Sequence, residues 1–192
     1  MNKYRTHNCG ELTSKNKNTD VSLSGWVNKK RDHGNLLFID LRDNYGITQC
    51  VVEKNNKNFS ELEKLQLESV IKVEGKVVER SKETINPEIK TGEIEIYLKT
   101  YSLLGECKEL PMPVFSDQEY SEEIRLKYRF LDLRRKKIHE NIILRSKVIS
   151  FIRNKMINLG FLEYQTPILT SSSPEGARDF LVPSRLNPGK FY

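Results

Sequence analysis

A basic turn followed by an aromatic residue has the chemistry needed to hold single-stranded nucleic acid. The turn at residues 28–34 contains Lys29, Lys30 and Arg31, and Phe38 follows it within an apolar segment. Cations neutralise phosphate, and an aromatic ring stacks on an unpaired base with a free energy of about 1–3 kcal/mol. The alternative is that Phe38 belongs to the core and that the lysines are simply solvated.

The alternation of residues around Phe38 favours the first interpretation. In an extended segment, side chains point alternately to opposite faces. The apolar residues of one face are Leu37, Ile39 and Leu41. Phe38 therefore falls on the other face, together with Asp40 and Arg42. An aromatic ring on a polar face calls for a reason, and contact with a base supplies one.

Two further polar residues lie on neighbouring strand-like segments and can bond to a base edge. Gln49 can both donate and accept, and Glu95 can accept from an amino or imino N–H. Taken alone, such residues are usually surface side chains. They gain significance only if the fold brings them beside Phe38.

The segments that must position these residues are short strands. The sequence predicts strands over 21–30, 35–43, 47–53, 70–80 and 93–103, with one helix over 59–67. Five strands with a helix between the third and fourth are typical of the OB-fold. That small Greek-key barrel binds oligonucleotides across its second and third strands. Other five-stranded barrels fit the same pattern.

The second half of the sequence changes character. Pro111 and Pro113 exclude a helix and indicate a linker. Helices are predicted over 122–133 and 138–159, the second with an apolar stripe and with Gly160 at its end. A strand-like segment over 161–169 carries Pro167 near its end. The predicted organisation is an all-β barrel over 1–104, a linker over 105–121 and the start of an α+β domain over 122–192.

Charge and cysteine usage narrow the classes of function. The net charge of +6 is concentrated in residues 123–155, which contain eleven basic and three acidic residues. This run either faces a polyanion or a domain interface, or it is a solvated face. Three scattered cysteines indicate isolated thiols rather than a disulfide framework or a zinc site. No apolar run is long enough for a membrane span or a secretory leader, so a cytoplasmic protein is expected.

Six segments together resemble the bacterial aspartyl-tRNA synthetases, a class II family. They are GWVN (25–28), FIDLRD (38–43), TGEIE (91–95), RLKYRFLDLRR (125–135), TPILT (166–170) and PEGARDFLVPSR (174–185). The first alone indicates only an OB-fold, whereas the last two together are highly specific. The resemblance covers essentially the whole chain.

The resemblance implies roles for individual residues of the barrel. The residue matching Phe38 stacks on the central anticodon base, and that matching Gln49 contacts the same base. The residue matching Glu95 reads the first anticodon base. Arg31 and Arg80 are similar to further contacts with the anticodon loop.

The resemblance also implies roles outside the stacking site. His33, together with Glu83, is expected to affect which tRNA is charged, because family members restricted to the aspartate tRNA often carry leucine at the position of His33. The helix over 138–159 and the strand ending at Pro167 match the motif that builds the family's homodimer interface. Glu175 matches the acid that holds the amino group of aspartate; without the resemblance it is an ordinary loop acid.

The implied activity is ATP-dependent activation of aspartate and its transfer to tRNA, with Mg²⁺ on the triphosphate. The resemblance places no catalytic residue within 1–192, and no metal site is expected there. We therefore expect this polypeptide to bind an anticodon but to form no adenylate and to need no cofactor of its own. The alternatives are a free-standing OB-fold module for single-stranded nucleic acid and a relative that charges asparagine or lysine.

Overall fold

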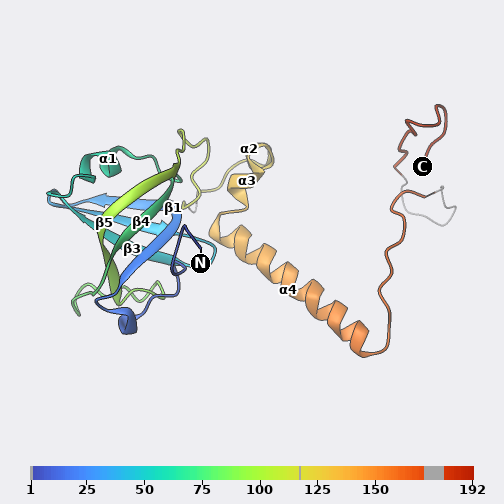
Figure 1. The fold of residues 1–192 in the computed structure, drawn as a ribbon. Coiled ribbons are helices and arrows are strands. Elements are labelled where there is room, and N and C mark those ends of the chain that lie inside the picture. The colour runs from blue at the N-terminus through green and yellow to red at the C-terminus, as the bar shows by residue number, and fades with distance from the viewer. Residues whose placement is uncertain (1, 117, 171–179) are drawn as a thin grey trace. The chain divides into compact units, whose positions relative to one another are not determined.

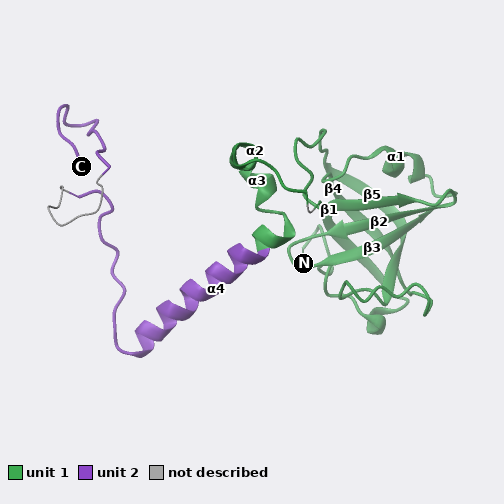
Figure 2. Cartoon of the chain, turned by 180° about the vertical axis from the view of Figure 1, so that it is seen from behind, with its two compact units in different colours: residues 1–139 green, residues 140–192 purple. Residues whose placement is uncertain are grey.

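The chain forms two compact units, residues 1–139 and 140–192 (Figure 2). The computed structural model describes residues 2–116, 118–170 and 180–192. The first unit contains a β-barrel, three short α-helices and the start of a long helix, and the second contains most of that long helix.

Five strands close into a barrel in the first unit (Figure 1). They are β1 (Asp20–Asp32), β2 (Leu36–Arg42), β3 (Ile47–Glu53), β4 (Val70–Glu79) and β5 (Ile94–Gly105). Their order around the barrel is β1-β2-β3-β5-β4, and only the β3–β5 pair is parallel. A single turn of 3-10 helix, η1 (Ser14–Asn16), precedes β1, and α1 (Phe59–Lys64) lies between β3 and β4. The predicted OB-fold, with five strands and one helix, is confirmed.

Alternating apolar residues fill the barrel interior. On β2 the buried residues are Leu37, Ile39 and Leu41, while Phe38, Asp40 and Arg42 are half-buried on the outer face. The predicted facing of β2 is therefore correct. From α1, Phe59 and Leu62 join this core.

The three cysteines are free thiols, as expected. Cys9 and Cys50 are buried in the barrel core, and Cys107 is half-buried. Burial raises the pKa of the Cys50 thiol to about 12, so this group stays protonated at neutral pH. The two core thiols act as small apolar side chains.

The predicted linker is packed rather than extended into solvent. Met112 and Val114, which flank Pro113, are buried against Leu131 in a small second core. The partly buried residues around it are Leu110, Tyr120 and Tyr128. The prolines exclude a helix here, and Met112 and Val114 anchor the segment.

The single helix predicted over 122–133 is wrong, because the structure has two helices there. They are α2 (Glu122–Lys127) and α3 (Arg129–Asp132), and the break falls at Tyr128, with φ −110° and ψ 42°. Tyr128 packs against the second core, and the buried Asp132 carboxylate pairs with three arginines, Arg125, Arg129 and Arg135. These tertiary contacts override the helical pattern of the sequence.

The long helix α4 spans Lys136–Asn158, close to its predicted bounds. Gly160 ends it in the left-handed conformation, with φ +88°, as its position suggested. The strand predicted over 161–169 is wrong: this segment, including Pro167, is irregular. A strand needs a partner for its hydrogen bonds, and none of the described residues pairs with it. None of the described helices is long and apolar enough to cross a membrane.

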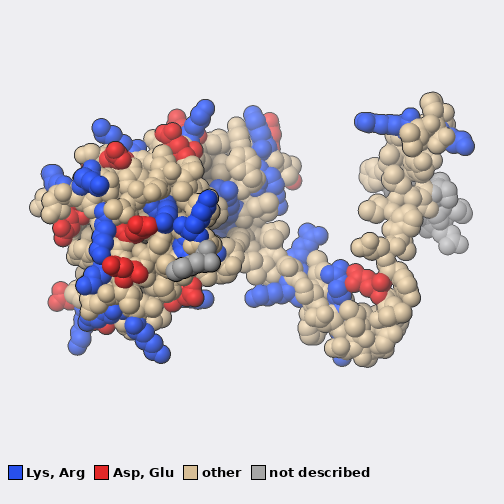
Figure 3. Space-filling view, viewed as in Figure 1, with Lys and Arg blue, Asp and Glu red and all other residues tan. Residues whose placement is uncertain are grey.

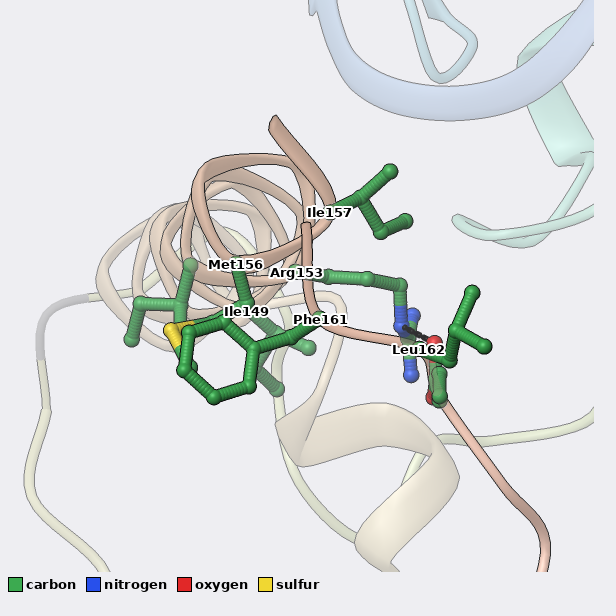
Figure 4. A pocket seen from close by; sticks show the side chains of 8 residues that line it. Ile149, Arg153, Met156, Ile157, Phe161 and Leu162 are labelled. Atoms are coloured by element: carbon green, nitrogen blue, oxygen red, sulfur yellow. Dashed lines mark ion pairs between the residues drawn. The ribbon is translucent and has the colours of Figure 1, made fainter. Parts of the chain in front are cut away.

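The apolar stripe of α4 is exposed along the second unit. Ile142, Ile149, Ile152 and Met156 are each at least two-fifths exposed. Near the end of the helix, side chains including Met156, Ile157, Phe161 and Leu162 line an apolar groove (Figure 4). An ion pair of 2.7 Å between Arg153 and Glu163 lies at this groove.

Candidate nucleic-acid interface

The turn between β1 and β2 presents a ring and two polar groups together. Phe38 stands opposite Arg31 on β1, and its ring centroid lies 5.9 Å from the Arg31 guanidinium carbon. The His33 ring meets Phe38 edge-on, with 5.3 Å between centroids and an interplanar angle of 85°. Within the turn, an Asp32 carboxylate oxygen accepts from the N–H of Gly34, which has φ +76°. Glycine suits this left-handed position, and the turn holds His33 at the edge of the Phe38 ring.

A row of hydrogen bonds crosses four strands beside Phe38. The Arg31 guanidinium donates to Asp40 at 3.0 Å and to the Gln49 side-chain carbonyl at 2.8 Å. The Gln49 amide donates in turn to the Glu95 carboxylate at 3.0 Å. The parallel pairing of β3 with β5 brings Gln49 and Glu95 together. The structure thus fixes the orientation of each polar group before any ligand binds.

Arg80 completes this row at the end of β4. Its Nε donates to the Ile94 carbonyl at 3.0 Å, one Nη donates to the Thr84 carbonyl at 3.3 Å, and Nε lies 3.8 Å from the Glu95 carboxylate. The Arg80 side chain is only 4% exposed, and its Nη2 has no hydrogen-bond partner among the described residues. A buried donor without a partner is costly.

Burial raises the pKa of the Glu95 carboxyl, and the nearby Arg80 cation and the Gln49 amide act in the opposite direction. Glu95 is thus a partly desolvated acceptor, flanked by two donors. A hydrogen bond from a base to such a group is stronger than one at an exposed carboxylate.

The structure brings together most of the predicted site residues. Arg31, Gln49, Glu95 and Arg80 lie in one connected row, with Phe38 beside Arg31. Asp40 is an additional member of the row that the sequence had placed only on the same face as Phe38. The shared alternation of Asp40 with Phe38 was the available signal.

The remaining predicted residues lie outside this row. His33 is exposed at its edge. Glu83 is exposed in the loop between β4 and β5 and makes no hydrogen bond to another described residue. Pro167 belongs to the second unit, and Glu175 lies outside the described residues.

The basic cluster of residues 125–137 is largely paired within the first unit. Arg125, Arg129 and Arg135 surround Asp132, and Arg134 reaches Glu68 of the barrel at 3.4 Å. These arginines were expected to face a polyanion or a domain interface, or to be solvated. Arg134 lies at a contact between the barrel and the segment that follows it. On the barrel itself, Lys and Arg atoms alternate with Asp and Glu atoms (Figure 3).

Comparisons with known proteins agree with this architecture. Residues 21–104 match the family model of the OB-fold nucleic acid binding domain, and residues 121–192 match that of the class II tRNA synthetases (D, K and N). All 192 residues of the chain match the aspartate–tRNA(Asp/Asn) ligase of Pelagibacter ubique at 78% identity, and the match covers 32% of that protein. They match the ligase of the same name from Phenylobacterium zucineum at 60% identity, again over 32% of that protein.

Solved structures show the same arrangement. The asparaginyl-tRNA synthetase from Pyrococcus horikoshii, complexed with asparaginyl-adenylate, has a TM-score of 0.81 at 28% identity. The match covers 94% of this chain and 41% of that one. A putative aspartyl-tRNA synthetase from Leishmania major also reaches a TM-score of 0.81, and at 21% identity it supports the fold alone.

The two matched models and their order show that the chain belongs to the class II tRNA synthetases of the D, K and N group. Within that group it corresponds to the N-terminal portion of the bacterial aspartate–tRNA(Asp/Asn) ligases. The chain spans about a third of the length of the curated relatives it matches, 32% in each of these two.

Proposed function

We propose that the protein containing this chain is an aspartate–tRNA ligase that charges both the aspartate and the asparagine tRNA, and that this chain reads the anticodon. The observation that supports anticodon reading best is the half-buried Phe38 beside the row formed by Arg31, Gln49, Glu95 and Arg80. A ring for stacking and preset polar groups for base edges are the features by which proteins recognise unpaired RNA bases.

Each residue of the row has a distinct proposed role. Phe38 stacks on the central anticodon base, and Gln49 contacts the edge of the same base. Glu95 accepts an N–H from the first base, while Arg80 adds positive charge toward the anticodon loop. Arg31 orients Gln49 and adds positive charge toward phosphate.

Binding of anticodon stem-loops to residues 1–192 tests this proposal. The aspartate and asparagine stem-loops should both bind, and a stem-loop with a changed central base should bind more weakly. Equal affinity for all three would show a sequence-independent module for single-stranded RNA instead.

Anticodon binding should weaken in acid at a higher pH than an exposed glutamate would allow. Burial raises the pKa of Glu95, and its protonation removes the charged acceptor. Affinity is therefore full above that pKa and falls as the pH drops through it, by about 1.5–3 kcal/mol for a hydrogen bond to a charged group. Titration of stem-loop affinity against pH measures this step.

Two variants identify the group responsible for this pH dependence. Glu95→Gln should bind more weakly and lose the step, whereas Glu93→Gln, at an exposed neighbouring position, should keep it. A step that persists unchanged in Glu95→Gln would assign the dependence to another group.

The proposed reaction uses aspartate, ATP and tRNA as substrates, which places it in the cytoplasm. Aspartate attacks the α-phosphate of ATP to give aspartyl-adenylate and pyrophosphate, and the terminal ribose of the tRNA then takes the aspartyl group. Among the described residues no three His, Cys, Asp or Glu side chains group closely enough to hold Mg²⁺, so no step is assigned to a metal here. Pyrophosphate exchange by the full-length enzyme should depend on aspartate, and dependence on asparagine or lysine would overturn the proposal.

The exposed apolar stripe of α4, with the groove at its end, is proposed to contribute to a homodimer interface. An apolar face of this extent is costly to leave in water. Sedimentation of the full-length enzyme should give the mass of two subunits, and a monomer at micromolar concentration would contradict this assignment.

A further inference from the structure

A tight turn between α1 and β4 carries a buried carboxylate. Glu68 is 4% exposed and adopts the left-handed conformation, with φ +64°. Its backbone N–H donates to the Val27 carbonyl at 2.8 Å, and the Val27 N–H donates to the Ser69 carbonyl at 2.9 Å. An uncommon backbone conformation of this kind persists only where the surroundings determine it. The Glu68 side chain is therefore held firmly against β1.

Two arginines from different parts of the unit meet at Glu68. Arg42, on β2 of the barrel, donates to both carboxylate oxygens at 2.7 and 2.8 Å, and Arg134, just after α3, donates at 3.4 Å. Both guanidinium groups also lie over the Trp26 ring, at 5.8 Å for Arg42 and 4.9 Å for Arg134. We call Trp26, Arg42, Glu68 and Arg134 the clasp.

The same turn holds the segment that leaves the barrel. The Ser69 hydroxyl accepts a hydrogen bond of 3.0 Å from the backbone N–H of Cys107. Residues 105–139 are thus attached to this turn at two points, one near their start and one at Arg134. Arg134 lies two residues before α4 begins at Lys136.

The clasp also adjoins the candidate nucleic-acid interface. Arg42 lies on the same outer face of β2 as Phe38 and Asp40. Charging requires the tRNA to be held by its anticodon while its terminal ribose reacts elsewhere, so the placement of the barrel matters for the reaction. A misplacement of about 1 Å can reduce a rate by about 100-fold.

We propose that Arg134 is a positioning residue for tRNA charging, which acts through Glu68 and Trp26 to fix the anticodon-binding barrel against residues 105–139. This inference rests on the proposed function. Arg134 contacts Glu68 and Trp26 rather than Phe38 or the hydrogen-bonded row beside it. Its loss should impair transfer to tRNA and leave both amino-acid activation and anticodon affinity intact.

Arg134→Met is the variant that tests this role without exposing a buried charge. Glu68 keeps its hydrogen bonds from Arg42 to both carboxylate oxygens, so no unpaired carboxylate remains in the interior. The Arg134 side chain is 39% exposed, and methionine keeps an apolar stem of similar length. Arg134→Lys restores the charge but not the planar group over Trp26, so it should recover activity only in part.

In the full-length enzyme, Arg134→Met should lower kcat/KM for tRNA charging by about tenfold, while aspartate-dependent pyrophosphate exchange stays at the wild-type rate. Stem-loop affinity of residues 1–192 should also be unchanged. The matched control is Lys99→Met, which removes an exposed ion pair of 2.7 Å between Lys99 and Asp20. Charging by Arg134→Met at the control's rate would overturn the proposal.

A second measurement on residues 1–192 is independent of catalysis. Cys9 and Cys50 are buried, so a thiol reagent reports mainly on the half-buried Cys107. Opening of the clasp should speed labelling of Cys107 several-fold in Arg134→Met. Burial and the Glu68 carboxylate raise the pKa of the Cys107 thiol, and the Arg134 cation opposes this rise. Loss of the Arg134 charge alone would therefore slow the labelling.

The two measurements separate the possible failures. If the wild-type enzyme charges no tRNA, the proposed function fails, and labelling of Cys107 still decides whether the clasp holds the segment. Fast labelling of all three cysteines would indicate global unfolding of Arg134→Met. The same two measurements would then be made on Arg134→Lys. Unchanged labelling together with unchanged charging refutes the positioning role.

Discussion

Replacing Phe38 by alanine should weaken binding of the aspartate anticodon stem-loop by about 1–3 kcal/mol, or roughly 5- to 150-fold. The ring is half-buried on the outer face of β2, next to the His33 ring and the guanidinium of Arg31. Alanine removes the surface on which a base stacks. The buried residues that support β2 from inside, Leu37 and Ile39, are untouched.

Fluorescence or calorimetric titration of residues 1–192 with the stem-loop measures the loss of affinity, and thermal unfolding measures the stability of the barrel. The matched control is Tyr45→Ala, which removes an exposed aromatic from the turn beyond the other end of β2. The control should bind as the wild type does. If Phe38→Ala keeps full affinity, or if it melts the barrel, the ring is a packing residue and the proposed stacking role is wrong.

The face of β2 on which Phe38 lies could be predicted because its signal is local. The alternation of buried and outward residues along β2 is fixed by strand geometry, so the face of Phe38 followed from three apolar neighbours. The bonds around it depend on contacts distant in sequence. Gln49 meets Glu95 only because β3 and β5 are paired across an intervening strand and helix, and no periodicity in either segment specifies that pairing.

Predictions failed where tertiary contacts decide the outcome. The periodicity of 122–133 indicated one helix, but Tyr128 and Asp132 each have a buried environment that breaks it. The apolar run at 161–169 has the composition of a strand, but composition does not supply a neighbouring strand for its hydrogen bonds. The basic cluster shows the same limit, because counting charges does not reveal that Asp132 and Glu68 pair with four of its arginines.

The exposed His33 at the tip of the β1–β2 turn is the residue with which we explain charging of two tRNAs. Its ring lies edge-on to Phe38, with 5.3 Å between the centroids, so it adjoins the ring proposed to stack on the central anticodon base. The aspartate and asparagine anticodons differ only in the third base, which is the next one along the strand. An imidazole can donate or accept a hydrogen bond and so can meet either base edge.

His33→Leu should therefore confine the full-length enzyme to the aspartate tRNA. Leucine offers no hydrogen bond, and leaving a base edge unpaired costs about 1–3 kcal/mol. Charging of the asparagine tRNA should fall by roughly 5- to 150-fold relative to the aspartate tRNA, as measured from kcat/KM with each tRNA in turn. His139→Leu, which changes a histidine at the start of α4, is the matched control and should charge both tRNAs as the wild type does.

The competing interpretation is that His33 is a solvated turn residue without a ligand. It predicts that the ratio of kcat/KM for the two tRNAs is the same in His33→Leu and in the wild type. A wild-type enzyme that rejects the asparagine tRNA as firmly as His33→Leu does would remove both the role of His33 and the proposed dual specificity.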